Sequence, residues 1–212
     1  MDTLGWMLKV RSTATKVQAA YQRAPFSGKY VLQEVAQFSD TIVMSCEPTN
    51  KAVGHLLYVS QQLCLRLLLS QRLMFTRGAI VIGDLVHRGN VIFGPALIEA
   101  HRLESTTAKN PRVLITPEVS RLLDIQPAPI RWPSEHPVFM DHDGWLFLDV
   151  LQEAGDFVSF WAHQLLTDLR RKHARDLKRP RGDLRDSILR KNRWMHSYIT
   201  GASRRAREAR RQ

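Results

Sequence analysis

The sequence predicts an α/β protein, an α+β sandwich in which helices cover a sheet, and three observations favour this class. Short apolar runs typical of strands alternate with longer segments that repeat apolar residues at helical spacing. The chain has 212 residues, which is long enough to bury a core. Its composition, 44% hydrophobic and 24% charged, is that of a globular protein. We expect one domain over residues 1–169 and a basic helical tail over residues 170–212.

The first third of the chain predicts a helix, a hairpin and a second helix. Residues 5–22 carry an irregular apolar stripe and are followed by proline and glycine, which end helices. Residues 30–38 and 41–46 are two β-prone runs separated only by two polar residues, which predicts a hairpin with Asp40 near its tip. Residues 52–75 repeat apolar side chains every three or four positions, which predicts the longest helix.

The remainder of the main domain alternates strands and helices around glycines and prolines. A buried strand is expected over residues 78–83 and 85–87, and further strands at 91–93, 112–115 and 144–151. Helices are expected at residues 95–103, 117–123 and 157–169. The first of them is opened by Gly94 and Pro95, because proline is tolerated at the first helical position. Residues 126–137 contain four prolines and predict a loop.

The positive charge is concentrated at one end of the chain. Residues 170–212 contain 16 Lys and Arg against 4 Asp and Glu, whereas residues 1–169 contain 15 and 16. Such a tail binds nucleic acid or acidic lipid, or is a solvated helix. Because no folded nucleic-acid-binding motif accompanies the charge, nucleic acid is not the expected partner. Residues 204–212 lack apolar periodicity and are not expected to pack on the domain.

Apolar side chains earlier in the tail could instead pack on the domain. They are Leu177, Leu184, Ile188, Leu189 and Trp194.

Nothing in the sequence predicts a membrane or secreted protein. No apolar run approaches the ~18–20 residues of a membrane span, and no secretory signal precedes the first helix. Cys46 and Cys64 lie inside apolar runs, which favours buried thiols in a reducing compartment. We therefore expect a cytoplasmic protein without a membrane partner.

Two residues stand out as candidates for chemistry. Asp40, on a rigid hairpin tip, is suited to bind a divalent metal. Asp is also common in tight turns simply because it tolerates their backbone dihedrals, so a purely structural role is the alternative. Arg102 follows a helix start and could bind phosphate with its planar fork, or it could pair with Glu99 three residues earlier. Spacing alone leaves both alternatives open for Arg102.

Four motifs occur in an order that carries a resemblance. They are FSDTIV at residues 38–43, RGAIVIG at 77–83, FGPALIEAHRLES at 93–105 and PRVLIT at 111–116. In this order they resemble class III nucleotidyl cyclases, and most of all the pyrimidine cyclases of bacterial Pycsar antiphage systems. The resemblance covers about residues 30–125.

The resemblance implies a reaction and a set of partners. A ribose 3′ oxygen would attack the α-phosphate of UTP, or less favourably CTP, to give the 3′,5′-cyclic monophosphate and pyrophosphate. Two divalent ions, Mn²⁺ or Mg²⁺, would clamp the phosphates, with Asp40 as a metal ligand and Arg102 as the catalytic arginine. The enzyme would be a head-to-tail homodimer with each site across the interface. Its product would act on a cyclic-nucleotide-binding effector in antiphage defence.

The sequence departs from that family in its first strand and in one side chain. The family's other metal aspartate lies on an opening strand well before Asp40, and only Asp2 and Glu34 are acidic in that region, so we expect the fold to lack the usual first strand. The transition-state asparagine of the family corresponds to Ile98.

The positions that read purines are also replaced. They correspond to Ala36, or by a one-residue slip to Val35 or Gln37, and to Val91. Losing two hydrogen-bonding readers argues against adenine or guanine selectivity. Two alternatives remain open: a catalytically inactive cyclase-like module that binds nucleotide or dimerises, and a basic nucleic-acid-binding protein.

Overall fold

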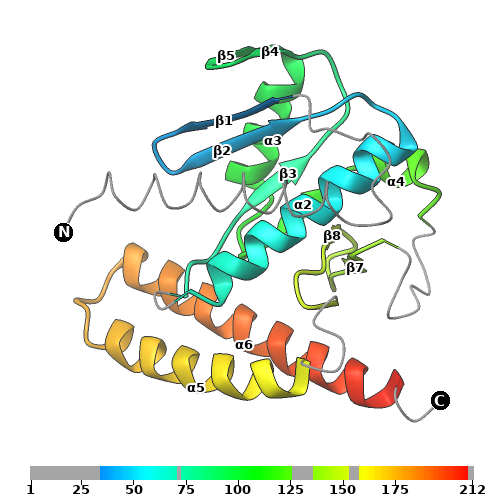
Figure 1. The fold of residues 1–212 in the computed structure, drawn as a ribbon. Coiled ribbons are helices and arrows are strands. Elements are labelled where there is room, and N and C mark those ends of the chain that lie inside the picture. The colour runs from blue at the N-terminus through cyan, green and yellow to red at the C-terminus, as the bar shows by residue number, and fades with distance from the viewer. Residues whose placement is uncertain (1–33, 71–72, 126–135, 153–157, 210–212) are drawn as a thin grey trace.

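A computed structural model describes residues 34–70, 73–125, 136–152 and 158–209, which form a mixed α/β structure (Figure 1). The strands are β1 (Glu34–Phe38), β2 (Thr41–Ser45), β3 (Gly78–Ile80), β4 (Val86–Arg88), β5 (Val91–Phe93), β6 (Val113–Ile115), β7 (Val138–Met140) and β8 (Leu146–Leu148). The helices are α2 (Asn50–Leu68), α3 (Pro95–Thr106), α4 (Pro117–Leu122), α5 (Val158–Leu177) and α6 (Asp183–Ala209). The helix expected over residues 5–22 lies outside the described residues. Within these four ranges, no helix is long and apolar enough to cross a membrane.

Strands β1 and β2 form the antiparallel hairpin that the sequence predicts, with Asp40 in its turn. The ladder runs from the turn to Glu34, which lies opposite Ser45 at the open end. Ser39 adopts a φ of 53°, a left-handed conformation typical of tight hairpin turns. The two strands form a sheet of their own.

Helix α2 packs along the main sheet and ends earlier than the expected residue 75. The hydroxyl of Thr49 caps its start by accepting a hydrogen bond from the backbone N–H of Ala52. The helix ends at Leu68, and Leu73 then takes a φ of 47° as the chain turns away. Leu73 is nevertheless buried. The apolar pattern therefore continues past the real end of the helix.

The main sheet has the strand order β3-β6-β8-β7. β3 and β6 are parallel and are connected through the β4–β5 hairpin and α3, whereas β8 is antiparallel to both of its neighbours. β7 is not predicted from the sequence, because this strand has only three residues and follows a proline-rich segment.

The expectation of a single buried strand over residues 78–83 and 85–87 is wrong. β3 ends at Ile80, and β4 pairs with β5 in a separate, largely exposed hairpin that turns at Gly89. The chain leaves the sheet where Gly83 packs against α3. A Cβ atom on Gly83 would lie 3.4 Å from the Cβ of Ala96.

The core lies on two sides of the main sheet. One apolar cluster fills the space between α2, the sheet and α4, and the other lies between the end of α2, the sheet and helices α5 and α6. Successive side chains of a strand point to opposite faces. Accordingly Leu146 and Leu148 belong to the first cluster and Phe147 to the second.

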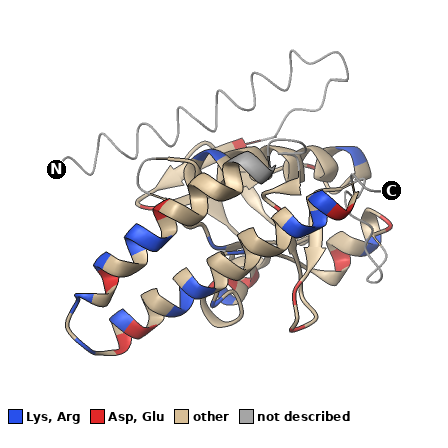
Figure 2. Cartoon of the chain, turned by 90° about the horizontal axis from the view of Figure 1, so that it is seen from below, with Lys and Arg blue, Asp and Glu red and all other residues tan. Residues whose placement is uncertain are grey.

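Helices α5 and α6 form an antiparallel hairpin along the lower side of the molecule (Figures 1 and 2). The expected boundary at residue 169 lies inside α5. Leu165 and Leu169, on one side of that boundary, share an apolar cluster with Ile199 and Ala202 on the other.

The expectation that residues 204–212 do not pack is wrong for the described residues 204–209. Ala206 is buried in the second cluster, and the guanidinium of Arg205 lies 3.8 Å from the ring centroid of Phe139. Small alanines and a cation–π contact replace large apolar residues here. Among the residues expected to pack, Leu189 is buried, whereas Leu177 and Leu184 are exposed at the tip of the hairpin.

Candidate functional site

Asp40 is exposed at the turn of the β1–β2 hairpin. The other acidic candidate that the structure describes, Glu34, lies at the open end of the same hairpin. With about 3.4 Å per residue, the backbone of Glu34 is roughly 14 Å or more from the turn, too far to share a metal ion with Asp40. Asp2 lies outside the described residues. The described part of the chain thus supplies one of the two carboxylates that the resemblance implies.

Helix α3 begins where the sequence places it, and its start depends on Gly94. This residue has a φ of 142°, and a Cβ atom there would lie 2.5 Å from the backbone oxygen of Asp84. That oxygen accepts a hydrogen bond from the N–H of Ala96 at 3.1 Å. Gly94 therefore docks the first turn of α3 onto the chain just before β4, and so fixes the position of Arg102 two turns later.

Arg102 lies on the exposed side of α3 and binds Glu99 with both arms of its fork. The distances from Nε and Nη2 of Arg102 to the two carboxylate oxygens are 2.7 and 2.6 Å. These hydrogen bonds lower the pKa of Glu99. The structure thus shows the Glu99 partner that the spacing allows. In the described residues no hydrogen bond or ion pair joins Arg102 to Asp40.

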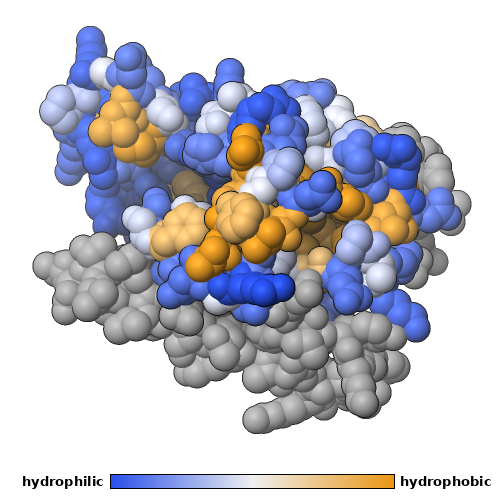
Figure 3. Space-filling model, turned by 90° about the horizontal axis from the view of Figure 1, so that it is seen from above, coloured by the Kyte–Doolittle hydropathy of each residue, from blue (hydrophilic) through white to orange (hydrophobic). Residues whose placement is uncertain are grey.

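Exposed apolar side chains lie on the elements that carry the two candidates and on the neighbouring β4–β5 hairpin. Phe38 is on β1 and Ile98 on α3, whereas Val86, Val91 and Phe93 are on the β4–β5 hairpin. Figure 3 looks onto the face that carries β4 and β5, and apolar side chains gather near its middle. The two hairpins are linked by a 2.8 Å hydrogen bond between the hydroxyl of Ser45 and Nδ1 of His87. Apolar patches of this kind are typical of contact surfaces.

The β4–β5 hairpin owes its apolar outer face to strand alternation. Val86 lies opposite Phe93, and Arg88 opposite Val91, all four on the same exposed face. Ile98, which the motif resemblance aligns with a transition-state asparagine, is 71% exposed on α3.

The positions that correspond to purine readers differ in environment. Ala36 is buried in β1, and Val91 is exposed on β5. Beside Ala36, Gln37 has a buried amide nitrogen that has no hydrogen-bond partner among the described residues. An unsatisfied buried donor of this kind costs free energy.

Other ionisable groups serve the fold. Arg112 is buried and ion-pairs with Asp141 and Asp143, and Asp141 also accepts a hydrogen bond from the indole of Trp194. Burial raises the pKa of Cys46 and of Cys64 to about 11, so neither thiol is ionised at neutral pH. Within the described ranges, no group of three or more His, Cys, Asp or Glu side chains could hold a metal ion.

A buried polar network joins α6 to the sheet and is not predicted from the sequence. The carboxylate of Asp149 accepts a 2.5 Å hydrogen bond from the hydroxyl of Tyr198 and pairs with Arg205 at 3.3 Å. The side chain of Gln61 donates to the backbone oxygen of Asp149. Burial and the Asp149 charge raise the pKa of Tyr198. Sequence separations of 49 and 56 residues give no local signal for these contacts.

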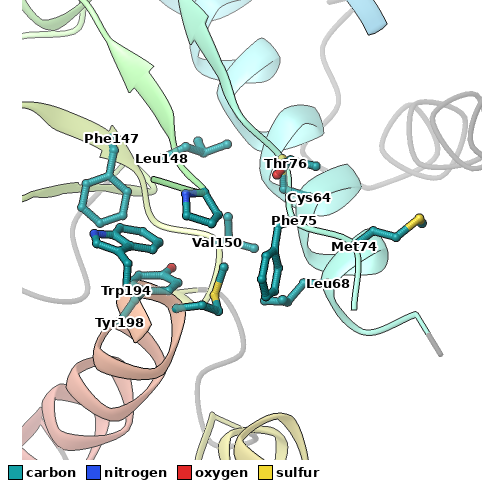
Figure 4. Close-up of a pocket in the computed structure, with 12 residues that line it drawn as sticks. Cys64, Leu68, Met74, Phe75, Thr76, Phe147, Leu148, Val150, Trp194 and Tyr198 are labelled. Atoms are coloured by element: carbon teal, nitrogen blue, oxygen red, sulfur yellow. The ribbon is translucent and has the colours of Figure 1, made fainter. Parts of the chain in front are cut away.

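One small pocket lies between α2, β8 and α6 (Figure 4). Trp194 and Tyr198 stack on each other there with ring centroids 5.3 Å apart, and Phe147 meets both rings edge-on. The lining is mostly apolar, and neither Asp40 nor Arg102 belongs to it. This pocket is a gap in the core rather than a nucleotide site.

Comparison of the chain with protein-family models, curated proteins and solved structures found no match. The assignments of Asp40 to a metal ion and of Arg102 to catalysis therefore remain predictions.

Proposed function

We propose that the chain is a pyrimidine nucleotide cyclase that acts as a homodimer and converts UTP, or less favourably CTP, to the 3′,5′-cyclic monophosphate. One observation carries the proposal. Asp40 and Arg102 are both exposed on elements with exposed apolar side chains, as expected of half-sites completed by a second copy. The product serves as a second messenger for a cyclic-nucleotide-binding effector in antiphage defence, a role that rests on the motif resemblance alone.

The proposal gives each candidate a separate task. Asp40 contributes a carboxylate to the divalent ions, Mn²⁺ or Mg²⁺, on one subunit. Arg102 of the other subunit exchanges Glu99 for the α-phosphate, and this exchange is cheap because an exposed ion pair adds little net stability. Gln37, a possible reader position by the one-residue slip, carries a side-chain amide that suits a carbonyl of a pyrimidine ring.

The experiment is a competition among the four ribonucleoside triphosphates in one tube with Mn²⁺, analysed by mass spectrometry. Cyclic UMP should be the main product, and Asp40→Asn should abolish it without changing the fold. Asp186→Asn, which removes an exposed carboxylate on α6, is the matched control and should leave turnover unchanged. A cyclic purine nucleotide as the main product would overturn the pyrimidine assignment.

A second candidate is a cyclase-like module that binds nucleotide without turning it over. Ile98 favours it, because an exposed isoleucine at the asparagine position supplies no hydrogen-bond donor to a transition state. The lone carboxylate at the hairpin turn favours it as well. Calorimetric binding of UTP with no cyclic product after prolonged incubation would select this candidate over the enzyme.

A further inference from the structure

The solvent face of α6 carries a continuous row of polar side chains, here called the basic stripe. Its members recur every three or four residues and are all exposed: Arg190, Arg193, Ser197, Thr200, Arg204 and Arg207. The opposite face of the helix is buried in the core through residues such as Met195 and Ile199. One face is therefore anchored, and the other is held toward solvent.

The arginines of the basic stripe are largely unneutralised. Arg190 donates a hydrogen bond only to the hydroxyl of Ser187. Arg204 forms a loose ion pair with Glu208 at 3.9 Å, without a hydrogen bond between them. Arg193 and Arg207 form no ion pair within the described residues. These guanidinium groups keep their donors available for an external anion.

Helix α5 extends the positive surface. Residues 170–209 contain 14 Lys and Arg against 4 Asp and Glu, and Figure 2 shows blue segments along both helices and around their connection. Among the acidic residues, Asp176 is already engaged by Lys172 and Arg179. Burial and the neighbouring positive charges of Arg77 and Arg190 lower the pKa of Lys191. Like charges are thus close to one another around Lys191.

The geometry of the stripe is fixed before any ligand arrives. Asn192, buried on the inner side of α6, donates a 3.0 Å hydrogen bond to Asp176 of α5. Tyr198 and Arg205 tie the same helix to Asp149. At 1.5 Å per residue, Arg190 and Arg207 are about 26 Å apart along the axis. A DNA duplex presents roughly 15 phosphate charges over that length.

The side-chain types in the stripe favour one kind of anionic partner over others. Arginine forks match phosphate oxygens, and short hydroxyl side chains between them leave room for a backbone to approach. The stripe has no aromatic residue on which unpaired bases could stack, as single strands require. The stripe itself also has no apolar residue to insert among lipid chains, as interfacial helices require, and the exposed Leu177 and Leu184 lie outside it at the hairpin tip.

We propose that the basic stripe of α6, extended by the exposed cations of α5, binds the phosphate backbone of double-stranded DNA without reading its sequence. This surface is separate from the proposed cyclase site. The sequence alone could not support it, because charge counts do not show which side chains share a face. No folded motif in the sequence accompanies the positive charge, and the anchored stripe is such a folded basic element.

The test is fluorescence anisotropy of the full chain with a labelled 20-base-pair DNA duplex over a series of KCl concentrations. Affinity should fall steeply with salt and be equal for duplexes of unrelated sequence. The triple variant Arg190→Gln, Arg193→Gln, Arg207→Gln should weaken binding at least tenfold at 100 mM KCl. It should also reduce the log–log salt slope by up to about 2.7, or 0.9 for each lost phosphate contact.

A second triple variant separates the stripe from net charge. Arg66→Gln, Lys109→Gln, Arg121→Gln removes the same charge from exposed positions outside the α5–α6 hairpin and should change affinity less than twofold. Equal losses in the two variants would overturn the proposal, and so would absence of DNA binding at 50 mM KCl. Vesicles of phosphatidylserine that bind as tightly as the duplex, with the same dependence on the stripe, would also overturn it. Circular dichroism of both variants confirms that the fold is kept.

Discussion

At the scale of single residues, the pairing of Arg102 with Glu99 makes a sharp test of the proposed catalytic role. A twin of this pair exists on α4, where Arg121 binds Glu118 with the same spacing at 3.0 Å. Both pairs are exposed, so each arginine can be removed with little effect on stability. Any difference between the two variants must then come from function.

We predict that Arg102→Ala lowers cyclase turnover on the order of 10²–10³-fold, because it removes a cation from the developing charge on the phosphate. Arg121→Ala should stay within twofold of the original rate. Glu99→Gln frees the guanidinium and should lower KM for UTP while kcat is kept. Steady-state kinetics measures all three. Indistinguishable rates for the two arginine variants would show that Arg102 is only a surface partner of Glu99.

At the scale of elements, Gly94 is the position where a single methyl group should displace a helix. Its φ of 142° is unfavourable for other residues, and an added Cβ would overlap the backbone oxygen of Asp84. We predict that Gly94→Ala lowers the free energy of unfolding by at least about 1–3 kcal/mol and lowers cyclase activity with it. Gly89→Ala is the control, since Gly89 also has a positive φ but faces open space. Urea titration should rank Gly94→Ala as clearly the more damaging of the two.

The α5–α6 hairpin should respond to acid through Asp176. Burial alone would raise the pKa of Asp176, but hydrogen bonds from Lys172, Asn192 and Arg179 outweigh it and the pKa is lowered. A carboxylate with a lowered folded pKa contributes stability above its unfolded pKa of roughly 3.9 and loses it as pH falls through the folded value. The free energy of unfolding should therefore drop below about pH 4.

Asp176→Asn tests this assignment. It should lower stability at pH 7 and flatten the dependence on pH below 4, because the titrating group is gone. Asp168→Asn affects a more exposed carboxylate paired with Arg171 and serves as the control. Urea unfolding followed by circular dichroism at pH 7 and pH 3, for the original chain and both variants, gives the six values needed. An unchanged pH profile in Asp176→Asn would show that other carboxylates govern the acid response.

Elements with strong local chemistry could be predicted from the sequence, and those that depend on distant partners could not. The polar pair before Thr41 predicts the β1–β2 turn, and Gly94 with Pro95 predicts the start of α3, because turn and cap preferences act within a few residues. β7 is three residues long and exists through its pairing with β8. The real end of α2 is hidden because Leu73 stays buried after the helix has stopped.

The same distinction between local features and distant contacts applies to the candidate site. Motif spacing predicts Asp40 at a turn and Arg102 on a helix, and both placements are confirmed. The pairing of Asp149 with Tyr198 and Arg205 needs contacts across about fifty residues, for which a single sequence has no signal. Whether a second copy of the chain brings Asp40 and Arg102 together stays a prediction.

At the scale of the whole molecule, the segment after Thr200 should be necessary for stability. It supplies buried Ala202 and Ala206, and the Arg205 partner of Asp149. We predict that a chain ending at Thr200 loses several degrees in Tm, because it uncovers part of a core cluster and leaves a buried carboxylate without its cation. A chain ending at Ala209 should melt like the full-length protein. If the shorter chain does not fold, Arg205→Gln supplies the same comparison with a single side chain, and an unchanged Tm in that variant would contradict the prediction.

The Asp149 network also sets an order of events during protein synthesis. Asp149 leaves the ribosome 56 residues before Arg205, and at 5–20 residues per second this separation corresponds to roughly 3–11 seconds. During that interval the carboxylate can still accept the hydrogen bond from the backbone N–H of Leu151, but it lacks Arg205 and, at first, Tyr198, so burying its charge beside β8 is unfavourable. A nascent chain halted in α6 should consequently remain sensitive to protease. Protection should begin only once Arg205 has been released.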